Sequence, residues 1–92
     1  MKFKRIPSRT RINDYPDFSP GDLVRLRGKL SYNKNDICLV LRYARRNALD
    51  RRNRKITMRR VLIMRTHRWY DGRITQIISN LDVNSIKEYF KE

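Results

Sequence analysis

The sequence predicts a mostly β domain, a small antiparallel barrel of about four to five strands with an irregular N-terminal arm and a short C-terminal helix. The chain has 92 residues, which is enough for one domain with a single compact core. Short apolar or alternating runs are separated by turn-forming residues, and no long helix is predicted between them. Strands that are short and consecutive in this way favour a small antiparallel barrel.

The predicted strands form the body of the domain. They cover residues 23–27, 37–41, 60–66 and 73–78. In the first, which follows a Pro-Gly-Asp turn, Val24 and Leu26 alternate with basic residues and are expected to face the core. The second is a continuous apolar run rich in branched residues, which is typical of a central strand. Asp71-Gly72 predicts a type I′ hairpin turn between the last two.

The two ends of the chain are predicted to have different structures. Residues 1–18 are interrupted by prolines and predict a basic N-terminal arm, ahead of a barrel domain that covers residues 19–92. At the other end Val83, Ile86 and Phe90 fall near helical spacing. A short C-terminal helix is therefore predicted over about residues 83–91.

Two connections are predicted within the barrel domain. The polar stretch KLSYNKND, which follows the first strand, is expected to be a loop. The Arg-rich insertion, residues 42–60, has too few apolar residues to dock firmly as a helix. We expect it to be a long, mobile connection between two strands, with partial helix formation left open.

Part of the chain resembles SH3-like barrels of the KOW type. The segment PGDLVRLRGKLSYNKNDICLVLRY has a Gly-Asp turn before a β-branched strand and a Gly-Lys loop after it. The matching residues are Gly21, Asp22, Gly28, Lys29 and Val40. The central glycine of the KOW pattern is replaced here, with Ile37 or Cys38 near its place. This departure favours the broader SH3-like resemblance, which covers about residues 19–83.

The latter half, VLIMRTHRWYDGRITQIISNLDV, is similar to the end of short SH3-like proteins of tailed phages. In those proteins a strand, a Trp, an Asp-Gly turn and a returning strand end in a Leu-Asp or Leu-Glu segment. The KOW resemblance implies RNA or polymerase binding, and the phage resemblance implies a virion connector or adaptor. A fold of this kind hosts many functions and does not choose between them.

The charge of the chain favours a polyanionic partner. The formal net charge is +14 and the isoelectric point is near 10.9, and a nucleic acid is the commonest partner of such a protein. Arginine dominates the insertion, and its planar fork pairs bidentately with phosphate and stacks on bases. A solvated loop and an acidic protein partner remain the alternatives. The candidate residues are Arg42, Arg45, Arg46, Arg51, Arg52, Arg54, Lys55, Arg59 and Arg60.

Two smaller groups of residues are further candidates for contact with a nucleic acid. Basic arms often lie along a nucleic-acid groove, but they are equally often disordered ends. An aromatic residue beside arginines could stack an unpaired base, although Trp69 is expected to pack against the barrel instead. The candidates are Lys2, Lys4, Arg5, Arg9 and Arg11 in the arm, and Arg68, Tyr70 and Arg73 near the Asp-Gly turn.

Enzymatic chemistry is not predicted. His67 is the only histidine and has no partner at ligand spacing, so neither a metal site nor a cofactor is expected. The chain has no Gly-rich phosphate loop and no cluster of carboxylates. Cys38 lies in an apolar run and predicts a buried thiol in a reducing, intracellular setting. No signal peptide or membrane span is predicted, and a transit peptide is the lesser interpretation of the N-terminus.

Two functions follow from these observations. The preferred one is a non-catalytic nucleic-acid-binding module, with RNA slightly favoured over DNA, which acts in a cytoplasm, alone or within a ribonucleoprotein or virion. The alternative is a structural or regulatory adaptor of a tailed phage that docks on a virion protein or a host polymerase. An adaptor needs an exposed apolar patch. The candidate patch residues are Phe3, Ile6, Tyr15, Phe18, Tyr89 and Phe90.

Overall fold

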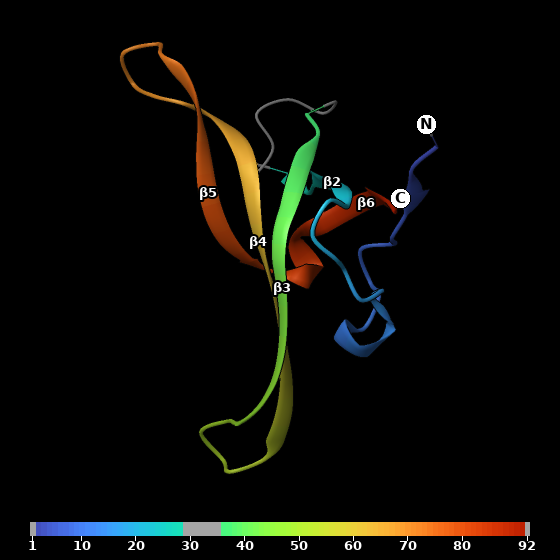
Figure 1. Cartoon of the computed structure of the whole chain (residues 1–92). Helices are drawn as coiled ribbons and strands as arrows, with labels where there is room; N and C mark the ends of the chain where they lie inside the picture. Colours follow the sequence, from blue (N-terminus) through green and yellow to red (C-terminus); the bar gives the residue numbers. More distant parts are fainter. Residues whose placement is uncertain (1, 29–35, 92) are drawn as a thin grey trace.

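The computed structural model describes residues 2–28 and 36–91 and contains one antiparallel sheet (Figure 1). The six strands have the order β1-β6-β2-β3-β4-β5. Their bounds are β1 Lys4–Arg5, β2 Leu23–Leu26, β3 Cys38–Leu49, β4 Lys55–Arg68, β5 Ile74–Asp82 and β6 Ile86–Phe90. Two short 3-10 turns are η1, Ile12–Asp14, and η3, Val83–Ser85. Residues 29–35 of the predicted polar loop lie outside the described residues.

The predicted mostly β class is confirmed, but the described residues form an open sheet rather than a closed barrel. Strands β1 and β5 are the two edges, and they do not pair with each other. The predicted C-terminal helix is wrong, because β6 pairs with β2 and with β1. Ile, Tyr and Phe favour strands over helices, and an irregularity in the pairing at Arg25/Leu26 hides the strand period in this short segment.

In the described part of the chain, one face of the sheet is covered. On this inner face Val24, Val40, Val61 and Ile63 are buried. They pack against residues from both ends of the chain. These are Ile6, Tyr15 and Phe18 from the N-terminal segment and Val83 and Ile86 from η3 and β6. The opposite, outer face carries the alternate side chains of the same strands and holds many of the exposed apolar residues, such as Leu39 and Ile78.

The N-terminal segment is part of the fold rather than a free arm. Ile6, Tyr15 and Phe18 are between 2 and 5% exposed, which removes them from the apolar patch that an adaptor was expected to present. Arg27 holds the segment, because its guanidinium donates to the Ile6 carbonyl at 2.8 Å and to the Tyr15 hydroxyl at 3.0 Å. The basic side chains of this segment still face solvent. They are Lys2, Lys4, Arg5, Arg9 and Arg11.

A buried guanidinium joins this segment to β4. Arg59 is 2% exposed and donates to the Tyr43 hydroxyl at 2.7 Å, to the Pro16 carbonyl at 2.8 Å and to Asp17 at 3.0 Å. It also donates to the Ile12 carbonyl. The Tyr43 hydroxyl hydrogen bond, aided by the charge of Arg59, lowers the pKa of Asp17 below its usual range. Arg59 was a candidate phosphate ligand, and its position inside the fold removes it from that set.

The Arg-rich insertion is a β-hairpin, not a mobile loop. Strands β3 and β4 pair without interruption from Arg42↔Leu62 to Leu49↔Lys55. The chain reverses between Asp50 and Arg54, where Asn53 adopts the left-handed conformation (φ 59°) that asparagine tolerates better than most residues. Strand pairing and this turn override the weak strand signal of a polar segment.

The turn between β4 and β5 falls where it was expected but has another geometry. Trp69 accepts a hydrogen bond from the Gly72 backbone at 3.0 Å and donates one to Arg73 at 2.8 Å, which leaves a three-residue loop. Gly72 has φ 87°, whereas Tyr70 and Asp71 do not have positive φ. The turn is therefore not type I′, which needs positive φ at both central residues.

Replacing Arg59 with alanine is expected to lower the free energy of unfolding by about 3 kcal/mol, since buried oxygen atoms lose a charged donor. Urea denaturation followed by Trp69 fluorescence measures the change. Arg60→Ala is the matched control one residue along the strand. Because the ion pair of Arg60 with Asp82 is partly exposed, the control is expected to lose about 1 kcal/mol or less. Equal losses in the two variants would contradict the role given to Arg59.

Candidate nucleic-acid interface

The hairpin of β3 and β4 extends beyond the body of the protein as a two-stranded ribbon (Figure 1). Strand β5 pairs with β4 only from Arg60 to Arg68, so residues 55–59 have β3 as their only neighbour in the sheet. We call residues 42–60 the Arg ribbon. The longest dimension of the molecule is 44 Å. This ribbon presents two faces and a tip, and each of them carries arginine.

The pairing of the ribbon sorts its charges by face. Directly opposed residues in an antiparallel pair point to the same side of the sheet. Arg42, Arg46 and Arg60 therefore share the outer face, and their opposed residues on the neighbouring ribbon strand are Leu62, Met58 and Ala44. Arg45 and Arg59 form the one opposed pair of arginines in this strand pairing. They lie on the inner side, where Arg59 is buried and bonded to Asp17.

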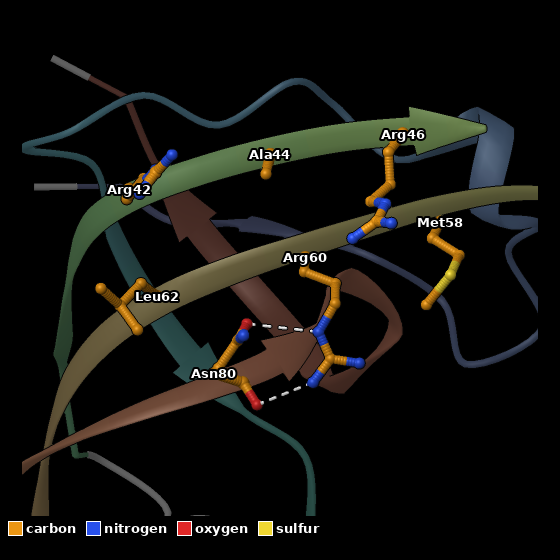
Figure 2. A pocket seen from close by; sticks show the side chains of 7 residues that line it. All are labelled: Arg42, Ala44, Arg46, Met58, Arg60, Leu62 and Asn80. Atoms are coloured by element: carbon orange, nitrogen blue, oxygen red, sulfur yellow. Dashed lines mark hydrogen bonds between the residues drawn. The ribbon is translucent and has the colours of Figure 1, made fainter. Parts of the chain in front are cut away.

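A hollow of about 210 Å³ lies on the outer face of the ribbon where it joins the body (Figure 2). Its lining consists of Arg42, Ala44 and Arg46 from β3, Met58, Arg60 and Leu62 from β4, and Asn80 from β5. Three guanidinium groups thus surround an apolar floor. Such a combination can pair with phosphate oxygens while a flat, apolar group such as a nucleobase rests on the floor.

The three arginines of the hollow are held differently. Arg60 is fixed, because it donates to the side chain and backbone oxygens of Asn80 at 3.3 and 3.1 Å and to Asp82 at 3.0 Å (Figure 2). Arg42 and Arg46 are exposed and have no hydrogen bond or ion pair within the described part of the chain. The hollow therefore combines one preorganised cation with two that are available to an incoming anion.

The tip of the ribbon is also an ordered cationic surface. Asp50 accepts hydrogen bonds from the backbone N–H groups of Arg54 and Arg52, at 2.9 and 2.8 Å, and pairs with the Arg54 side chain. These backbone hydrogen bonds, that of Arg54 foremost, lower the pKa of Asp50. Asp50, the single acid of the ribbon, thus stabilises the turn. Arg51, Arg52 and Lys55 face solvent without an ion-pair partner in residues 2–28 and 36–91.

The remaining candidate residues lie in two other places. Arg68, Tyr70 and Arg73 are at the β4–β5 turn, at the opposite end of the sheet from the ribbon tip (Figure 1). Tyr70 is fully exposed there. Trp69 was expected to pack against the barrel; it is 41% exposed and contacts His67 and Thr75 of its own hairpin. The charges of the N-terminal segment form a third group.

Four residues of the hollow were not foreseen from the sequence. They are Ala44, Met58, Leu62 and Asn80. The signal was present as alternation, because small or apolar residues at 44, 48, 56 and 58 are interleaved with polar ones. Once the segment is taken as a strand pair, this alternation places these residues between the arginines of the outer face.

The described residues contain no grouping of three or more His, Cys, Asp or Glu side chains suited to a metal ion. Over the same residues no helix reaches the length and apolar character required to cross a membrane. Comparisons with family models, with characterised proteins and with solved structures give no match to this chain. Its function must therefore be inferred from the arrangement of its own residues.

The thiol of Cys38 is expected to be unreactive in the folded protein. Burial, followed by the nearby charge of Asp36, raises the pKa of this thiol to about 11, so the nucleophilic thiolate is scarce at neutral pH. Labelling with a chromogenic disulfide reagent at about pH 8 should be slow in buffer and fast in denaturant, where the pKa returns to its ordinary value. Fast labelling of the native protein would show that this side chain is accessible.

Proposed function

We propose that this protein is a non-catalytic nucleic-acid-binding module that grips the phosphate backbone with its Arg ribbon. The observation that carries this proposal is the set of exposed arginines without carboxylate partners in the described part of the chain. Within the Arg ribbon these are Arg42 and Arg46 at the hollow and Arg51 and Arg52 at the tip. A nucleic acid carries negative charge along the whole of its backbone. It would therefore neutralise arginines that are spread along a projecting ribbon.

The form of the ribbon supports a grip on the backbone rather than recognition of sequence. Its cations occupy both faces and the tip, so phosphates can approach from several sides at once. Contacts of this kind position a protein on the nucleic acid and carry little sequence information. The apolar floor beside Arg42 and Arg46 could add stacking of a base, which every base permits. Weak sequence preference is therefore part of the proposal.

Fluorescence anisotropy with labelled single- and double-stranded RNA and DNA tests this function. If about four to six phosphates are neutralised, affinity is expected to fall by roughly two to three decades between 50 and 200 mM salt. The double variants Arg42→Ser/Arg46→Ser and Arg51→Ser/Arg52→Ser should each reduce the salt slope by about two and weaken binding about tenfold or more.

The matched control is Arg9→Ser/Arg11→Ser, which removes the same charge from the segment that covers the inner face. It is expected to change affinity far less than either ribbon variant. If all three double variants lose affinity equally, net charge alone would account for binding and the ribbon would have no special role. Binding that does not depend on salt would overturn the proposal.

The adaptor function of a phage protein remains the second candidate, and one observation favours it. A row of apolar side chains crosses the outer face, each directly opposite the next in the strand pairing. We call it the outer apolar row; it consists of Phe90, Leu23, Leu39, Met64 and Ile78. Exposed apolar surface of this kind marks protein contacts. Weak binding to every nucleic acid, unchanged in both ribbon variants, would favour the adaptor.

A further inference from the structure

The free edge of β5 lacks the features that normally protect such an edge. In the sheet of the described residues β5 pairs with β4 alone, in continuous register from Arg60↔Asp82 to Arg68↔Ile74. Residues 74–81 contain no charge and no proline, although 35% of the chain is charged. Edge strands of monomeric proteins usually carry a lysine, a proline or a bulge that prevents further pairing. This strand is instead regular, open along one side and uncharged except at its last residue, Asp82 (Figure 1).

The hydrogen-bonding groups of this edge can be assigned to particular residues. Trp69 donates to the Arg73 carbonyl, so this is a hydrogen-bonded pair, and such pairs alternate along an antiparallel ladder. The odd-numbered residues of β5 therefore bond to β4. Ile74, Gln76, Ile78 and Asn80 direct their backbone N–H and C=O groups toward the open edge. Their side chains all lie on the outer face, because their opposed residues on β4 do.

The outer apolar row ends at this edge. It begins at Phe90 on β6 and passes through three strands to Ile78, which is 59% exposed. Ile78 lies at the middle of β5, and its own backbone groups are among those that point outward. An added strand with an apolar residue opposite Ile78 would extend the row and bond these groups at the same time.

We propose that β5 pairs antiparallel with β5 of a second copy of this chain, about a two-fold axis at Ile78. This register makes Ile78 oppose itself and Gln76 oppose Asn80, so that outward-directed backbone groups meet in pairs across the edge. It also places Ile74 opposite Asp82 of the second copy. This Asp82 would then lie next to Arg73, the residue that precedes Ile74. The same patch serves both copies, as a two-fold interface requires.

The charge distribution of the molecule is compatible with this pairing. Each chain carries a net charge of +14, which opposes association. The charge is concentrated in the Arg ribbon, however, and the tips of the two ribbons would project to opposite ends of the joined sheet because β4 and its copy run antiparallel. Salt screens the remaining repulsion, so self-association should become stronger as salt is added.

Sedimentation equilibrium without nucleic acid tests the proposal, over roughly 1 to 300 µM protein at low and high salt. A monomer–dimer equilibrium that salt strengthens is expected. Ile78→Lys would place two lysines face to face at the axis and raise the dissociation constant at least about tenfold. Ile74→Lys is the matched control, since Ile74 is on the same face and strand and is 53% exposed, but its lysine would face Asp82 of the second copy.

Mixing Ile78→Lys with Ile78→Glu is the decisive arm. Only a contact in which residue 78 meets itself predicts that both variants are weakened alone and that the mixture associates again. A protein that stays monomeric at high concentration and salt, or equal losses for the lysines at 74 and 78, would overturn the proposal. The experiment contains no nucleic acid, and added salt should strengthen self-association whereas it should weaken nucleic-acid binding. These results are therefore independent of the proposed function.

Discussion

The buried guanidinium of Arg59 is the interaction on which the rest of the structure depends. A charged group inside a protein is tolerated only when its hydrogen bonds are satisfied. Here the acceptors come from the N-terminal segment, at Ile12, Pro16 and Asp17, and from Tyr43 on the neighbouring strand. The guanidinium therefore draws the segment onto the inner face, where Phe18 and Tyr15 complete the core. Among the described residues no comparable segment covers the outer face.

Strand register and surface charge are linked in the Arg ribbon. The observed pairing places Arg42, Arg46 and Arg60 opposite neutral residues. A slip of two residues in one direction would oppose Arg42 to Arg60, and in the other direction Arg46 to Arg60, and like charges directly opposite destabilise a sheet. The observed register opposes one arginine pair of its own, Arg45 and Arg59, but Arg59 is paired with Asp17 inside the fold, so this register keeps opposed like charges off the outer face. The spacing of the arginines leaves Arg42 and Arg46 on the outer face with Ala44 between them, and both are exposed.

Local patterns predicted the parts of the fold that depend on local physics. The alternation in residues 23–27 and the branched runs before and after the ribbon are confirmed as strands. The docking of the N-terminal segment and the strand at Ile86–Phe90 were missed, since each is stabilised by residues far away in the chain. Pairing across the Arg ribbon was missed because its two strands carry few apolar residues and its turn has no Gly or Pro. The cations of the site could be named from composition. The face of the sheet on which each cation lies could not be predicted, and neither could the burial of Arg59, because both depend on the register of the strands.

Charge couples the Arg ribbon to the edge of β5. In a two-fold pairing about Ile78, the outer faces of both copies point to the same side, so both hollows around Arg42 and Arg46 would face one nucleic acid. A polyanion bound there would neutralise the repulsion that opposes pairing, and pairing would double the number of phosphate contacts. Each event would therefore favour the other by the same free energy. In this arrangement the edge of β5 and the dense arginines would act together, because a bound nucleic acid would supply counter-charge that strengthens the association of two such basic chains.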